Sequence, residues 1–74
     1  MDKKKDAYAE TLHGNDIKTI RKQLGLTQKE FASLVHVSVK TIERWEAGDK
    51  EISGPIVSLV RILHADPALV EKLK

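Results

Sequence analysis

Apolar residues recur along most of the chain at intervals of three and four residues, the spacing of one face of a helix. In the first such segment the apolar positions are Ile17, Ile20 and Leu24. Asn15 or Asp16 is suited to cap its start, and Gly25 to end it, because glycine readily adopts a left-handed backbone conformation. The pattern predicts a first helix over residues 15–24.

Two short helices are predicted next. Thr27 and Glu30 have the spacing of a capping box, in which each side chain reaches the other residue's backbone N–H, and they predict a helix over about residues 28–35. Ser38 is the next capping candidate, and Gly48 is suited to end the helix that follows. The inward apolar positions are Phe31, Ala32, Leu34 and Val35 in the first of these helices, and Ile42 and Trp45 in the second.

Two further helices close the chain. Ser53 precedes a proline by two residues, an arrangement typical of a capped first turn, and the apolar residues that follow predict a fourth helix. Asp66 followed by Pro67 repeats the arrangement and predicts a fifth. No segment alternates apolar and polar residues as a strand does. We therefore expect an all-α domain of five helices over residues 15–74, preceded by a flexible tail over residues 1–14.

Composition narrows the functional classes. The chain lacks cysteine, which excludes a disulfide framework and thiolate metal ligands, and its 4% aromatic content argues against a stacking platform for single-stranded nucleic acid. No apolar run approaches the roughly 20 residues of a membrane span, and the first residues lack the apolar stretch of a signal peptide. We therefore expect a cytoplasmic protein with no membrane contact. A net charge of +2 is compatible with a nucleic-acid partner but does not decide the question.

Residues 26–48 place the second and third predicted helices around a turn of about three residues, which is the spacing of a helix-turn-helix motif. Ala32 falls where two such helices cross, and a larger side chain there would separate them. The inner side of the third helix is occupied by apolar residues. The 3.6-residue period then turns four residues outward as a candidate contact face: Val39, Lys40, Glu43 and Arg44.

Two parts of this stretch carry a family resemblance. Leu26-Thr27-Gln28 begins the second helix, and Trp45-Glu46-Ala47-Gly48 closes the third. Together with Val37-Ser38 in the turn, they resemble the phage-repressor and Cro type of helix-turn-helix domain, the XRE family, over about residues 17–63. The resemblance implies a five-helix, lambda-repressor-like DNA-binding domain whose third helix reads the major groove of an operator.

The resemblance also implies which side chains touch the DNA backbone. Gln28 would hydrogen-bond a phosphate at the start of the second helix, where backbone N–H groups and the helix dipole favour an anion, with Lys29 assisting. Thr41 and Lys50 would hold the sugar-phosphate backbone.

The outward face of the third helix would then meet base edges. Arg44 can grip guanine O6 and N7 with two donors, Lys40 can do so with one head group, and Val39 can meet a thymine methyl. Glu43 stays open between two roles. It either accepts a hydrogen bond from cytosine N4, or repels phosphate and serves only to orient Arg44 or Lys40.

Other members of the pattern are assigned to the scaffold. Arg21 and Glu46 occupy positions that pair across the domain in similar repressors, and a paired charge tolerates burial where a lone one does not. Trp45 has the helical phase of the core positions and is expected inside. His36 stands in the turn where the family usually has glycine, so a positive φ with some strain is expected there.

Metal, cofactor and catalytic chemistry are not expected. His13, His36 and His64 lack ligand spacing and cysteine partners, so no metal or other cofactor is predicted. The chain has no Gly-rich phosphate loop, nucleophile elbow or evident acid–base carboxylate pair, so it is not expected to be an enzyme. The lysines at positions 3–5 are assigned to a solvated tail in preference to an arm in the minor groove.

The sequence thus predicts a DNA-binding transcriptional repressor, bound as a homodimer to a palindromic operator with half-sites about 34 Å apart. A second setting fits as well: an antitoxin that neutralises a partner toxin while repressing its own operon. Single-domain antitoxins resemble this chain at residues 45–48, 53–55 and 66–69. In that setting the tail and last helix would contact the toxin or a second copy. A third setting is a helix-turn-helix fold that bridges other proteins and does not bind DNA. It is less favoured, because it assigns no role to the outward side chains of Lys40 and Arg44.

Overall fold

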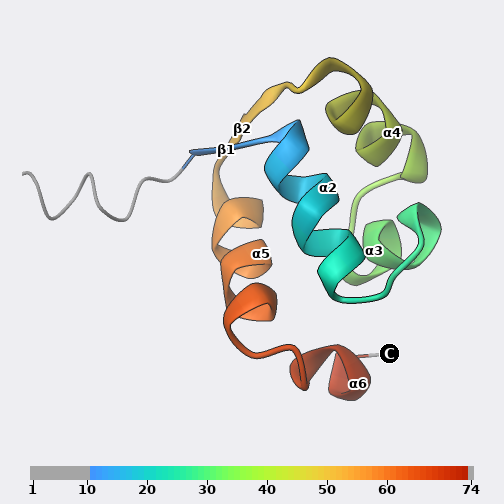
Figure 1. Cartoon of the computed structure of the whole chain (residues 1–74), viewed down its shortest axis with the longest axis vertical. Helices are drawn as coiled ribbons and strands as arrows, with labels where there is room; N and C mark the ends of the chain where they lie inside the picture. Colours follow the sequence, from blue (N-terminus) through green and yellow to red (C-terminus); the bar gives the residue numbers. More distant parts are fainter. Residues whose placement is uncertain (1–10, 74) are drawn as a thin grey trace, which may run out of the picture.

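Five helices and one short two-stranded sheet form the part of the chain that the structure describes, residues 11–73 of a computed structural model (Figure 1). In chain order the elements are β1 (Thr11–His13), α2 (Gly14–Gln23), α3 (Gln28–Leu34), α4 (Val39–Gly48), β2 (Glu51–Ser53), α5 (Pro55–Ala65) and α6 (Leu69–Leu73). α2 lies between α5 on one side and the α3–α4 pair on the other, and it contacts both α4 and α5 (Figure 1). The predicted fold of five helices is confirmed, with a small sheet added to it.

The sheet joins the start of the described chain to the segment before α5. β1 and β2 pair antiparallel, and Leu12 lies opposite Ile52. Both side chains are buried, at 8% and 4% exposure. The expectation of no strands is wrong, because three-residue strands with one apolar residue each are too short to show alternation. Residues 11–14, expected in the tail, are part of the folded domain, whereas residues 1–10 of that tail lie outside the described residues.

The start of α2 is capped differently from the sequence prediction. His13, and not Asn15 or Asp16, is the N-cap residue, and its backbone N–H donates to Oδ2 of Asp16 at 2.9 Å. The N–H of Asn15 donates to Oδ1 of Asp49 at 2.9 Å. The first turn of α2 is therefore satisfied partly by a residue from the far end of α4, which no local pattern could indicate.

The caps of α3 and α4 follow the sequence prediction closely. The N–H of Glu30 donates to Oγ1 of Thr27 at 3.0 Å, and the N–H of Thr27 donates back to Oε1 of Glu30 at 2.9 Å, which confirms the capping box. Oγ of Ser38 accepts from the N–H at the third position of α4 at 3.1 Å. At the end of α4 the left-handed residue is Asp49, with φ 48°, whereas Gly48 is still helical.

The last two helices begin one and two residues later than predicted. Gly54, with φ 99°, is the N-cap of α5, and Ser53, the expected cap, belongs to β2. Asp66 ends α5 rather than capping the next helix directly. A turn follows, in which the N–H of Leu69 donates to the carbonyl of Asp66 at 3.0 Å, and α6 starts at Leu69.

The hydrophobic core lies where α2, α3, α4 and α5 face one another. Its most deeply buried large side chains come from all four helices: Ile17, Phe31, Ile42, Val57, Val60 and Leu63. Trp45 is half-buried and packs against this cluster, as its helical phase predicted. No helix within residues 11–73 combines the length and the apolar character needed to cross a membrane.

Candidate nucleic-acid interface

α3 and α4 form a helix-turn-helix unit held together from the inside. The two helices contact each other, Ala32 of α3 is buried, and its carbonyl accepts from the N–H of Val37 in the turn at 3.0 Å. Ile42 is fully buried on the inner side of α4. His36 has φ 62°, so the left-handed conformation expected in the turn is confirmed. This packing determines which side of α4 faces outward.

The outward side of α4 carries three exposed charged side chains, two of them about one helical turn after the first. Lys40, Glu43 and Arg44 are all exposed, at positions i, i+3 and i+4 of the same helix. Val39, the fourth predicted contact, is half-buried and packs partly against the hydrophobic core. Only part of the Val39 side chain is therefore accessible to a thymine methyl group.

The candidate phosphate contacts lie at the starts of α3 and α4 and just beyond the end of α4. Gln28 and Lys29 begin α3, the first half-buried and the second exposed. Thr41 is half-buried in the first turn of α4. Lys50 is exposed just beyond α4, and its Cε lies 3.5 Å from where a Cβ on Gly48 would stand, so its side chain folds back along the helix end. All eight predicted contacts thus lie on α3, on α4 or, for Lys50, two residues beyond the end of α4.

A buried ion pair stands behind the outward face. Nε of Arg21 donates to Oε2 of Glu46 at 2.8 Å, and a terminal nitrogen of Arg21 donates to Oε1 of Glu46 at 3.0 Å. The other terminal nitrogen donates to the carbonyl of Leu26 at 2.9 Å. The pairing of α2 with α4 across the domain, expected from the sequence, is confirmed. Because both carboxylate oxygens are engaged, the pair is of the bidentate kind that tolerates burial.

The carboxylate of Glu46 has a third donor that sequence reasoning missed. Nε2 of Gln28 donates to Oε1 of Glu46 at 3.0 Å, across the contact between α3 and α4. Burial by itself raises the pKa of Glu46, but the hydrogen bonds from Arg21 and Gln28 and the positive charge of Arg21 outweigh it and hold the pKa below its usual value. Glu46 is therefore ionised at neutral pH, and its hydrogen bond with Gln28 connects this predicted phosphate contact to the buried Arg21–Glu46 pair.

Gly14 is a second residue whose importance was missed. It begins α2, and its N–H donates to the carbonyl of Lys50 at 2.8 Å. A Cβ there would overlap the carbonyl oxygen of Trp45 and lie 2.6 Å from its carbonyl carbon and 3.0 Å from Cα of Asp49. The start of α2 and the end of α4 approach so closely that only glycine fits. A glycine at the edge of a polar tail carries no sequence signal of this contact.

The histidines lie on separate elements. His64 shares a 3.0 Å hydrogen bond with Gln23, and Nδ1 of His13 lies 4.0 Å from Oδ2 of Asp16. His36 is in the turn of the helix-turn-helix unit. Within residues 11–73 no three histidine, aspartate or glutamate side chains gather as a metal-binding group would.

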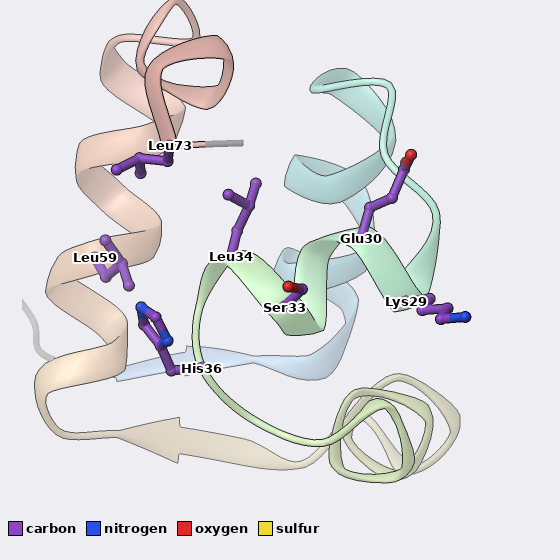
Figure 2. Close-up of a pocket in the computed structure, with 7 residues that line it drawn as sticks. All are labelled: Lys29, Glu30, Ser33, Leu34, His36, Leu59 and Leu73. Carbon is purple, nitrogen blue, oxygen red and sulfur yellow. The ribbon is translucent and has the colours of Figure 1, made fainter.

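A groove of about 660 Å³ opens beside the helix-turn-helix unit, between α3, α5 and α6. Figure 2 shows Leu34, Leu59 and Leu73 around this opening, with His36 beside Leu59. Besides His36 in the turn, the polar part of the lining comes from α3: Lys29, Glu30 and Ser33. Leu73, one of the apolar residues that line the groove, is 52% exposed.

Comparison with known proteins assigns the domain. The sequence pattern of the helix-turn-helix family HTH_3 matches residues 17–60, which include all of α3 and α4. The chain belongs to this helix-turn-helix family. The predicted resemblance to the XRE type is confirmed, and the protein carries a DNA-binding domain of a family that typically has no enzymatic role.

Curated relatives of this helix-turn-helix protein include both regulators and antitoxins. The chain is 34% identical over 53 residues to antitoxin HigA-2 of Vibrio cholerae, covering 72% of the chain and 51% of the relative. It is 34% identical over 58 residues to the uncharacterized HTH-type transcriptional regulator YiaG of Escherichia coli, covering 78% of the chain and 60% of the relative. Antitoxin MqsA of Escherichia coli is 32% identical over 66 residues, covering 89% of the chain and 50% of the relative. The chain thus spans half to three fifths of the length of these relatives.

Proposed function

We propose that the protein is a sequence-specific transcriptional repressor that reads an operator with the outward face of α4. The observation that carries the proposal is the exposed row of Lys40, Glu43 and Arg44 on a helix anchored from behind by Ile42 and a buried ion pair. Arginine and lysine match the acceptors of guanine in the major groove, and a rigidly held helix presents them in a constant register.

In this proposal the eight predicted contacts divide into two groups. The base-reading group is Val39, Lys40, Glu43 and Arg44. The phosphate group is Gln28, Lys29, Thr41 and Lys50. The structure supports the division by placement alone, since the first group shares α4's outer side and the second flanks it. Two copies bound to a palindromic site would place their α4 helices about 34 Å apart on one face of the duplex.

Selection of bound sequences from random double-stranded DNA, followed by titration, tests the proposal. We expect one palindromic site to be bound at least about a thousandfold more tightly than random DNA, with a steep dependence on salt concentration. Binding of the best selected site within a few-fold of random DNA would refute a specific repressor. Sedimentation of the complex decides whether two chains bind each site.

Two alanine substitutions separate base reading from anchoring. Arg44→Ala should weaken binding to the selected site by about 1–3 kcal/mol and relax the preference at one base pair, whereas Gln28→Ala should weaken binding to all sequences alike. Arg61→Ala is the matched control, because it removes the same charge from an exposed position on α5, across α2 from α4 (Figure 1). Indistinguishable effects of the first two variants on every sequence would contradict the division of roles.

A second candidate function is that of an antitoxin, which is compatible with repression. Two observations favour it: curated relatives are named antitoxins, and an apolar groove with an exposed Leu73 lies beside the DNA-binding unit. The test is co-expression with the protein encoded by the adjacent gene. We expect co-purification that Leu73→Glu abolishes and Ile62→Glu preserves, since Ile62 is equally exposed, at 51%, but does not line the groove. Absence of a complex would remove this candidate and leave repression standing.

A further inference from the structure

The hydrogen bond between Gln28 and Glu46 constrains the orientation of a predicted DNA contact. A glutamine amide presents either its NH2 group or its oxygen on a given side, and a glutamine in solvent samples both orientations and several rotamers. Glu46 is ionised, so it accepts hydrogen bonds and donates none. The amide of Gln28 must therefore direct Nε2 toward Glu46, as the 3.0 Å contact shows.

The carboxylate that orients Gln28 is itself buried and held by two hydrogen bonds from Arg21. Both of its oxygens accept from Arg21, and the side chains of Arg21 and Glu46 are only 10% and 5% exposed. Arg21 is held in turn by the carbonyl of Leu26, directly before α3. Three elements thus converge on one carboxylate: α2 through Arg21, α4 through Glu46 itself, and α3 through Gln28.

We propose that Glu46 is a positioning residue for DNA binding, whose carboxylate, clamped by Arg21, holds the amide of Gln28 so that its second N–H donates to a DNA phosphate. The inference rests on the proposed phosphate contact of Gln28 and deepens it. One N–H of Nε2 is used by Glu46, and the other diverges from it because the two amide hydrogens point about 120° apart. The oriented amide offers phosphate a donor, and the rotamer ordering that binding normally costs has already taken place in the folded protein.

A merely structural role for the Arg21–Glu46 pair gives a different result in DNA binding. If the pair only stabilises the fold, its removal weakens DNA binding by the same factor whether or not Gln28 is present. If it positions Gln28, its removal matters only while Gln28 is present. The two possibilities are separated by a double-mutant cycle measured as DNA affinity.

The cycle uses Arg21→Met/Glu46→Met as one arm and Gln28→Ala as the other. Replacing both charges leaves no buried charge unpaired, and such apolar replacements are often neutral for stability. Titration of fluorescent operator DNA is done with the four full-length proteins, at a temperature where circular dichroism shows each to be folded. We expect the methionine pair to weaken binding about threefold to tenfold when Gln28 is present, the equivalent of one ordered side chain. In the Gln28→Ala background we expect less than about twofold.

Nitrogen-15 relaxation of the Gln28 side-chain amide provides a second measurement that needs no variant. In the DNA-free protein we expect an Nε2 order parameter near that of rigid backbone, about 0.85, where an unrestrained side chain gives less than about 0.6. Where the methionine pair folds, the same measurement repeated in it should show a lower order parameter for Gln28, with Gln23 as the internal control because its partner is His64.

The outcomes distinguish this inference from the proposed function. Equal losses of affinity in both Gln28 backgrounds, or a mobile Gln28 amide, would overturn the positioning role while leaving DNA binding intact. A Gln28→Ala variant with unaltered affinity would remove the phosphate contact, and the inference with it, without affecting the reading face of α4. Failure of the unaltered protein to select any operator would instead count against the proposed repressor. Should the methionine pair not fold, the relaxation measurement alone decides.

Discussion

Substitution of Gly14 by alanine tests the contact that fixes the end of α4 against the start of α2. The added Cβ would overlap the carbonyl oxygen of Trp45 and lie 2.6 Å from the carbonyl carbon and 3.0 Å from Cα of Asp49. All three atoms belong to backbone, so no side chain can rotate away. The two helices must separate, which strains the 2.8 Å hydrogen bond from the Gly14 N–H to the carbonyl of Lys50.

The expected cost follows from overpacking of a rigid contact. Insertion of a methyl group into a well-packed site typically costs about 1–3 kcal/mol, and the involvement of backbone places Gly14→Ala at the upper end. In a domain of this size that corresponds to a fall in the thermal midpoint of about 10–20 °C. Thermal and urea unfolding followed by circular dichroism measure it.

Gly48→Ala is the matched control within the same pair of helices. A Cβ at Gly48 would meet only side-chain carbons of Lys50, at 3.5 Å and beyond, and the residue is helical. Because alanine is a better helix former than glycine, stability should be unchanged or rise by up to about 1 kcal/mol. If Gly14→Ala unfolds within about 0.5 kcal/mol of the unaltered protein, the domain absorbs the methyl group without strain, contrary to the reasoning above.

Two further predictions concern stability. His36→Gly should raise the free energy of unfolding by up to about 1 kcal/mol by relieving a left-handed histidine, whereas Gly25→Ala, at φ 72° with open space around the Cβ position, should lower it by a similar amount. Urea denaturation in which both variants shift the same way would contradict this. Because the pKa of Glu46 is lowered in the folded state, its contribution to stability is fully present above the ordinary glutamate pKa of 4.5 and is lost as pH falls through the folded pKa. Urea unfolding between pH 6 and pH 3, roughly the range around that pKa, should show this loss, and it should be smaller in Arg21→Met/Glu46→Met.

The helix-turn-helix unit and its outward face follow from local patterns in the amino-acid sequence. The capping box of Thr27 and Glu30 joins groups only three residues apart, and so does the cap at Ser38. The residue types at these positions therefore suffice to predict where α3 and α4 start. The helical period then assigns Lys40 and Arg44 to solvent once Ile42 is recognised as core. The Arg21–Glu46 pair could be predicted only because the family resemblance indicated which positions pair.

Features whose partners are distant in the chain follow only from the way the helices pack. Leu12 and Ile52 lie opposite each other in a sheet whose strands are too short to show alternating apolar and polar residues. Their pairing brings residues 11–13 into the domain. Gly14 is required by backbone atoms of α4, more than thirty residues away, and the amide of Gln28 is oriented by Glu46, 18 residues away. Local propensities act on the backbone within a few residues, whereas such contacts depend on how the helices are placed in space. The amino acids at these positions therefore acquire their roles only in the folded chain.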